Sequence, residues 1–280
     1  MNKKKLFVHV SDLLVYLILI FMVMITLLPL GWIISTSLKS STEIFAKPPY
    51  WIPKHATVQS YLDVLFSSGI PRAFGNSVIV GAVTALLALL LGGSAGYAFA
   101  RFQFRGKTFF SMFMLLSQML PLTVLMIPLF YMCNRVGLVD AKLGLSLAHL
   151  VISMPLVTWM AKGYFKGIPK EIEEAAVVDG CNTLQSLWHV VIPLLRPALA
   201  ATGIYAFISS WNEFALANVL TRSEVSRTVP IALNEFSSFF KVDWGDTMAA
   251  ATIITIPIIF LFLCIQKQFV EGLASGAVKG

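Results

Sequence analysis

Six long stretches of this 280-residue sequence are free, or nearly free, of charged side chains. A helix that crosses the hydrocarbon core of a membrane needs about 20 mostly apolar residues. The six stretches are Leu13–Leu38, Ala73–Ala100, Thr108–Asn134, Leu143–Ala161, Pro197–Thr221 (interrupted only by Glu213) and Thr247–Gln266. Backbone groups in lipid must be hydrogen-bonded within the segment, and the short alternating strands of a barrel are not visible. The sequence therefore predicts an all-α polytopic membrane protein with six transmembrane helices.

Composition supports this class and excludes others. Charged residues make up 12% of the chain and hydrophobic residues 57%, whereas a soluble domain carries about 25% charged residues. The net charge of +7 fits basic residues retained on the cytoplasmic side of a membrane. Basic patches with interleaved aromatic residues are missing, so no nucleic-acid partner is expected. Cys133, Cys181 and Cys264 are far apart and form no C-x-x-C pair, which predicts neither a metal nor a redox site.

Basic clusters set the orientation. Lys3–Lys5 precede the first apolar stretch, which is longer than a signal peptide and has no A-x-A cleavage site after it. Arg101, Arg105 and Lys107 lie together in a short loop, where the positive-inside rule is strongest. Both clusters are therefore assigned to the cytoplasm. Six spans then place both termini there, with residues 222–246 outside.

The cytoplasmic loop of residues 162–196 predicts a short helix. Pro169 suits a first helical turn because its missing N–H is not needed there. Glu171, Glu173 and Glu174 follow at the positive end of the helix dipole. Gly180 is placed to end the helix in a left-handed cap.

A second short helix should follow this turn. Asn182 or Thr183 can cap its start, and we expect it to end at Pro193. The loop is thus predicted to be two short helices joined at Gly180 and lying outside the bilayer.

The spacing within this loop resembles the EAA loop of ABC importer permeases, which reads EAA, three residues, G, nine residues, then I-x-L-P. Here Val190 and Ile192 replace Ile and Leu of that pattern. The resemblance implies a role in coupling to an ATPase subunit for Glu174, Ala175, Ala176, Asp179, Gly180 and Pro193. Two alanines would permit close approach of the backbone, and Glu174 would pair with a basic residue of the ATPase. The alternative is a solvated surface helix with acidic residues in its first turn.

Five further segments are similar to carbohydrate-importing permeases of the maltose type, in the second-permease branch. They are NSVIVGAV from Asn76, YAFARFQFRGK from Tyr97, WNEFALA from Trp211, DWGDTMAAATI from Asp243 and QKQFVEGLASGAVKG from Gln266. The resemblance implies a single transmembrane domain over residues 1–280, in the plasma membrane of a bacterium or archaeon and surrounded by its lipid. The implied partners are a second, different permease, two ATPase subunits and an external sugar-binding protein.

No nucleotide site is expected in this chain, because it has no G-x-x-x-x-G-K-[ST] loop. ATP and Mg²⁺ would be bound by the partner ATPase, so the chain is not itself an enzyme and needs no cofactor. The expected mechanism is alternating access, in which ATP binding and hydrolysis turn a shared cavity outward and then inward.

Polar residues within the spans are candidates for function, because ionisable groups at membrane depth are expensive. Trp211, Asn212 and Glu213 are assigned to a possible translocation path. The alternative for Glu213 is a helix-end residue that reaches the interface or bonds a neighbouring helix. Gln118 and His149 are expected to form helix–helix hydrogen bonds.

Two outer segments carry further expectations. The resemblance implies that the loop of residues 222–246 reaches a docked binding protein through Asn234, Glu235, Phe236, Ser237 and Ser238 and helps to release its sugar. The alternative is a surface-lying segment that closes the outer face of the bundle. The tail of residues 266–280 reads alone as a frayed terminus, whereas the resemblance implies that it reaches between the ATPase subunits.

Two other classes of membrane protein compete with this interpretation. A secondary transporter would show internal repeats, discontinuous helices and buried charge pairs, but we find no convincing repeat and Glu213 stands alone. A membrane-embedded enzyme would need converging catalytic groups, and His149 has no evident partner in the sequence.

Overall fold

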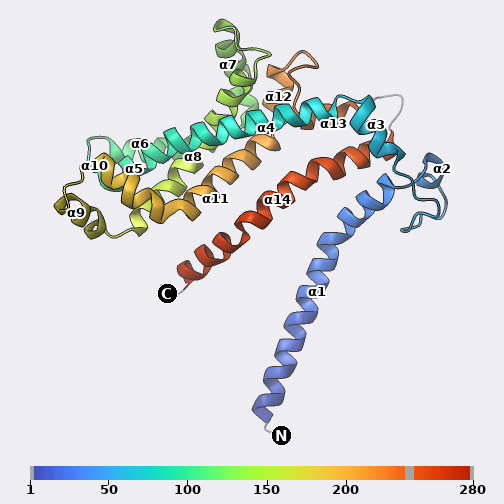
Figure 1. Cartoon of the computed structure of the whole chain (residues 1–280), viewed down its shortest axis with the longest axis horizontal. Coiled ribbons are helices and arrows are strands. Elements are labelled where there is room, and N and C mark those ends of the chain that lie inside the picture. Colours follow the sequence, from blue (N-terminus) through green and yellow to red (C-terminus); the bar gives the residue numbers. More distant parts are fainter. Residues whose placement is uncertain (1–2, 237–242, 278–280) are drawn as a thin grey trace. The chain divides into compact units, whose positions relative to one another are not determined.

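The computed structural model describes residues 3–236 and 243–277 (Figure 1), and within these ranges the regular structure is entirely helical. This confirms the predicted all-α class. The chain divides into two compact units, one formed by Met1–Ser68 with Leu233–Thr255 and the other by Gly69–Ala232 with Ile256–Gly280.

The first unit begins with the long helix α1 (Lys3–Ser37). None of its apolar spanning window is buried within the chain, so the helix presents apolar side chains on all sides, as a lipid-facing span does. The connection that follows is held by Lys39, which is only 3% exposed. Its amine donates to the carbonyl of Tyr50 at 2.6 Å and lies 4.2 Å from the ring centre of Trp32. The unit also holds α2 (Ser41–Ile44), α3 (Gln59–Ser67) and the first part of α14 (Trp244–Ala277).

Three spans form the centre of the second unit, where Figure 1 shows α4, α5, α8 and α11 side by side. One span is α4 (Ile70–Leu87), a π-helical turn and α5 (Gly93–Arg101) in sequence. The next is α8 (Lys142–Gly167). A Cβ added at Gly96 of α5 would lie 2.6 Å from the Cβ of Ala161 and 2.8 Å from the backbone nitrogen of Lys162. The absent side chain of Gly96 therefore lets α5 and α8 pack backbone to backbone, as small residues do in membranes.

The third predicted span is broken rather than continuous. In place of one helix over Thr108–Asn134, α6 (Lys107–Ser117) and α7 (Leu122–Arg135) are bent by 103° at a short break. Pro121 lies in this break and precedes α7 directly. Proline lacks an N–H and disfavours helical backbone in the residue before it, which explains the interruption. With this bent pair counted as one span, six segments are long and apolar enough to cross a membrane.

The fifth span also differs from the prediction. The second cytoplasmic helix does not end at Pro193, because α10 (Thr183–Ser186), a π-helical turn and α11 (Ile192–Trp211) form one run. In the wider π turn the N–H of Ile192 donates to the carbonyl of Leu187, and Pro193, which has no N–H, follows Ile192 in α11.

The same run stops at Trp211, not at Thr221 as expected. Glu213 therefore lies outside it, ahead of the separate short helix α12 (Ala215–Leu220). The two loops that carry the predicted sites contain α9 (Lys170–Val178) in the loop predicted to be cytoplasmic and α13 (Val229–Glu235) in the loop predicted to be external, called the outer loop below. Within the second unit, Figure 1 shows α9 and α10 at one end and α12 at the other.

Candidate coupling and translocation sites

The turn between α9 and α10 has the left-handed geometry that the sequence predicts. Gly180 has φ +91°, a conformation that glycine adopts without a Cβ clash. Its N–H donates to the carbonyl of Val177, and the N–H of Cys181 donates to that of Ala176, both at 3.0 Å. These two bonds form a Schellman motif, which satisfies the last carbonyls of α9.

The start of α10 is fixed by a second local motif. The side-chain oxygen of Asn182 accepts the backbone N–H of Gln185, and the side-chain oxygen of Gln185 accepts the N–H of Asn182, both at 2.9 Å. This capping box identifies Asn182, rather than Thr183, as the cap. The loop is thus shaped by its own hydrogen bonds.

An anchor joins α9 to the spans. The Nε of Arg101 lies 2.5 Å from Oε1 of Glu173, and the hydroxyl of Tyr97 donates to Oε2 at 3.0 Å. Arg101 also donates to the carbonyl of Ile168 at 3.0 Å. Both side chains of the ion pair are largely buried, at 9% and 15% exposure. Glu173 is therefore committed to its own chain, whereas the neighbouring Glu174 is exposed and available to a partner.

Sequence reasoning did not find this anchor. Its signals were present in the YAFARFQFRGK segment, where Arg101 is the last residue of α5, and in the acidic first turn of α9. These signals could not be paired because Arg101 and Glu173 are 72 positions apart in the sequence.

The outward face of α9 combines an acidic residue with exposed apolar side chains. Glu174, Ala175, Asp179 and Gly180, four of the residues predicted to couple to an ATPase, are exposed, and Val178 is 87% exposed. Ala176 instead faces inward and is buried. A groove of about 400 Å³ runs beside this face and is lined by Glu173, Glu174, Val177, Val178, Thr183 and Ser186. Exposed valines beside a preformed groove are typical of a surface that binds another protein.

The WNEFALA segment forms a buried junction. Trp211 is 2% exposed and packs against the rings of Phe207 and Phe74, at centroid distances of 5.7 and 5.4 Å. The carboxylate of Glu213 accepts the backbone N–H groups of Leu216 at 2.8 Å and Ala217 at 3.0 Å, and so caps α12.

His149 joins the same junction from α8. Its Nδ1 lies 2.7 Å from Oγ of Ser210 and its Nε2 lies 3.1 Å from Oε2 of Glu213. The inference that His149 has no partner was wrong, because its partners are 61 and 64 residues away in the sequence. The expected helix–helix bond of His149 is present, and Glu213 bonds a neighbouring helix, which was the alternative considered for it.

A serine, a histidine and a carboxylate in a row also occur in nucleophilic enzymes. Here Ser210 is 5% and His149 2% exposed, so a substrate carbonyl has no approach to the serine oxygen. Both carboxylate oxygens of Glu213 are occupied by the cap of α12. The arrangement positions α12 against α8 and α11. Asn212 beside it is exposed, and the role of Trp211, Asn212 and Glu213 in a translocation path stays a prediction.

The first part of the outer loop is tied down by Asp140, in the α7–α8 connection. One of its carboxylate oxygens accepts the backbone N–H groups of Arg222 at 2.7 Å and Ser223 at 3.0 Å, and the hydroxyl of Ser226. Burial raises the pKa of Asp140, but these hydrogen bonds outweigh it and hold the pKa well below its usual range.

The NSVIVGAV segment completes this attachment. The side-chain amide of Asn76 on α4 donates to the carbonyls of Val225 at 2.7 Å and Arg227 at 2.8 Å. The hydroxyl of Ser77 accepts the N–H of Val229 at 2.9 Å. Residues 222–229 are therefore an ordered part of the second unit.

The second part of the outer loop carries the residues predicted to face a binding protein. Asn234 is exposed, Glu235 ends α13, and Phe236 is partly exposed. Ser237 and Ser238 lie outside the described residues.

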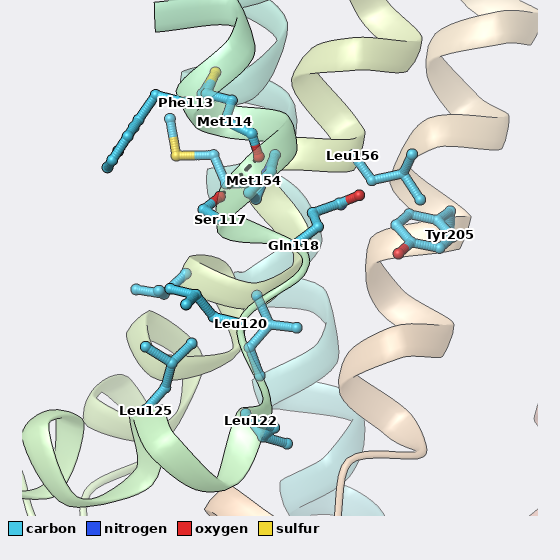
Figure 2. Close-up of a pocket in the computed structure, with 13 residues that line it drawn as sticks. Phe113, Met114, Ser117, Gln118, Leu120, Leu122, Leu125, Met154, Leu156 and Tyr205 are labelled. Carbon is cyan, nitrogen blue, oxygen red and sulfur yellow. Dashed lines mark hydrogen bonds between the residues drawn. The ribbon is translucent and has the colours of Figure 1, made fainter.

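A cavity of about 590 Å³ opens at the break between α6 and α7 (Figure 2). Its walls come from α6, α7, α8 and α11, and polar groups are contributed by Ser117, Gln118 and Tyr205. Gln118 is exposed and its side chain makes no hydrogen bond within residues 3–236 and 243–277. The helix–helix bond predicted for Gln118 is therefore not formed.

Comparisons with known proteins agree with this architecture. Residues 88–275 match the family of the binding-protein-dependent transport system inner membrane component. A solved structure of a bacterial ABC transporter involved in the import of the acidic polysaccharide alginate superimposes with a TM-score of 0.80. The match covers 96% of this chain and 99% of that chain at 23% sequence identity, so it supports the fold.

Three relatives are similar over nearly their whole length. The trehalose transport system permease protein SugB of Mycobacterium tuberculosis is 38% identical, over 91% of this chain and 93% of the relative. The diacetylchitobiose uptake system permease protein DasC of Streptomyces coelicolor is 32% identical, over 90% and 91%. The trehalose/maltose transport system permease protein MalG of Thermococcus litoralis is 32% identical, over 93% and 94%. The chain belongs to the family of binding-protein-dependent transport system inner membrane components and is a multi-pass permease subunit of an ABC importer.

Proposed function

We propose that this permease imports a small saccharide together with a second, different permease, two ATPase subunits and an external binding protein. The observation that carries the proposal is the outward face of α9, where Glu174 and Val178 border a groove next to two preformed turns. The saccharide class rests on the relatives named for trehalose, diacetylchitobiose and maltose transport. ATP and Mg²⁺ are bound by the ATPase subunits.

The contacts of α9 provide a route by which movement of a docked ATPase subunit would be transmitted to the membrane spans. Arg101 and Glu173 fasten α9 to α5, and the capped start of α10 continues into α11. Movement of an ATPase subunit against α9 would therefore act on two spans at once. We propose that this converts closure and opening of the ATPase pair into alternating access of the saccharide cavity.

In this assembly both termini lie in the cytoplasm and the outer loop faces the binding protein. Residues 222–229 are held by Asp140 and Asn76, so they form a base from which Asn234–Ser238 would reach the docked protein and help to release its saccharide. The tail of residues 266–280 would reach the ATPase subunits.

One pair of substitutions tests the docking surface. Val178→Glu adds a charge to an exposed side chain of α9, whereas Val58→Glu makes the same change at an exposed position of the first unit. We expect Val178→Glu to lose ATPase subunits when the detergent-solubilised complex is purified, and Val58→Glu to retain them. A Val178→Glu complex that keeps its ATPase subunits and wild-type uptake would overturn the assignment of α9.

A further inference from the structure

We propose that this chain contacts the transported saccharide directly, through the side chains of Gln118 and Tyr205 at the break between α6 and α7. The inference rests on the proposed function and adds a binding site within this subunit.

The broken span gives the first argument. Irregular backbone at membrane depth is stable only where it is buried in protein or lines a water-filled cavity, and discontinuous helices often form the substrate sites of transporters. The break between Ser117 and Leu122 borders a cavity of about 590 Å³. Ligand pockets are typically about 300–1,000 Å³, so the volume suits a mono- or disaccharide.

The side-chain amide of Gln118, which makes no hydrogen bond in the described part of the chain, gives the second argument. Gln118 is exposed, and its amide can take hydrogen-bond partners at two donors and one acceptor. Gln118 has no such partner in the described part of the chain. Figure 2 shows its amide directed toward the side of the cavity where Tyr205 and Leu156 lie. Those donors and that acceptor are therefore available to a molecule that enters the cavity.

The chemistry of the walls indicates which partner fits. An amide offers two donors and an acceptor, and a phenol offers one of each, which complements saccharide hydroxyls that both donate and accept. The ring of Tyr205 and the apolar side chains of Leu122, Leu125 and Met154 provide surfaces for the C–H faces of a sugar ring. Ser117 is a weaker candidate, because its hydroxyl already donates to the carbonyl of Met114 at 2.7 Å, and the hydroxyl of Tyr205 shares one hydrogen bond with Ser209.

Two conservative substitutions test the contact in proteoliposomes that contain the whole complex and its binding protein. Gln118→Met keeps length and volume but removes the amide, and Tyr205→Phe removes only a hydroxyl. Tyr131→Phe is the control, because Tyr131 is 61% exposed and does not line the cavity. Uptake of labelled trehalose, maltose and diacetylchitobiose is measured together with ATP hydrolysis.

We expect Gln118→Met to raise the ATP hydrolysed per saccharide imported by about tenfold, the equivalent of one lost hydrogen bond, and Tyr205→Phe to raise it by a smaller factor. Tyr131→Phe should leave the ratio unchanged. Wild-type ratios in both cavity variants would overturn the inference. So would a parallel loss of uptake, ATP hydrolysis and complex assembly, since Gln118 would then be satisfied by the second permease. If the wild-type complex imports none of the three saccharides, the proposed function itself fails.

Discussion

Arg101 holds Glu173 at 2.5 Å across 72 residues of sequence, and this ion pair joins the C-terminal end of α5 to the first turn of α9. The hydroxyl of Tyr97 completes the contact. Because both charges are largely buried, each depends on the other. A helix held in this way cannot swing freely when a partner bound to it moves.

Breaking the pair should uncouple the transporter. Arg101→Gln leaves Glu173 buried without its cation, a change that costs about 3 kcal/mol, and we expect both thermal stability and coupled uptake to fall. Arg105→Gln is the matched control, because Arg105 is exposed in the same basic loop. The double variant with Glu173→Gln should be less impaired than the sum of the single variants. Strictly additive losses would show that the two side chains do not interact.

The turn at Gly180 should discriminate between residues by backbone conformation alone. Its φ of +91° strains a β-branched side chain, whereas asparagine tolerates the left-handed region better. No neighbouring atom lies within 4 Å of an added Cβ, so sterics beyond the backbone are not involved. We expect Gly180→Val to insert normally but to lose most uptake and stimulated ATP hydrolysis, and Gly180→Asn to keep more of both. Equal activity of the two variants would contradict a role for the turn.

Asp140 should hold the outer loop independently of pH in the physiological range. Its pKa in the folded protein is depressed, so its stabilising contribution is fully present above the unfolded value of about 3.9 and is lost only as pH falls below that toward the folded pKa. We expect hydrogen exchange of residues 222–229, corrected for intrinsic rates, to be equal at pH 5 and pH 7.5. Asp140→Ala should remove the protection at both values. Glu224→Ala, at a side chain that is 83% exposed, is the control.

The orientation can be tested with two cysteines in a chain whose own cysteines are replaced by serine. Ser226 and Ser186 are buried, so exposed neighbours are better positions. A cysteine in place of Glu224 should react with an impermeant thiol reagent on intact cells, and one in place of Leu184 should react only after lysis. Reversed labelling would place α9 outside and rule out its docking to an ATPase.

Removal of Asn234–Ser238 should separate the two roles considered for the outer loop. If the segment helps to release saccharide, basal ATP hydrolysis should remain while stimulation by the binding protein falls. If it only closes the outer face, assembly should fail or basal hydrolysis should rise. Unchanged uptake would exclude both roles. The deletion leaves residues 222–229, which Asp140 and Asn76 hold, in place.

The fold was largely predictable because charge is excluded from lipid, so apolar stretches reveal the spans directly. Two local motifs were also predictable, the cap at Gly180 and the capping residue Asn182, because each depends only on neighbouring residues. The splitting of the span at Pro121 into two helices bent by 103° was not predicted, because proline also occurs inside unbroken membrane helices, as Pro128 and Pro155 show here.

The long-range contacts that build the sites could not be predicted from neighbouring residues or from apolar stretches. The partners of His149, Glu173 and Asn76 lie between 61 and 151 residues away, and a single sequence gives no register between distant segments. The segments that resemble other permeases and contain Asn76, Tyr97 and Trp211 include residues that make long-range contacts in the structure.

If α11 pivots at the end that α10 joins, a small movement there becomes a larger one at its other end. Its 20 residues span about 30 Å, close to the thickness of the hydrocarbon core. Tilting such a rod by about 10° about its inner end would shift its outer end by about 5 Å. That outer end carries Ser210 and Trp211, which are packed against the junction of His149 and Glu213. The junction would therefore act as the far end of a lever whose near end is driven at α10.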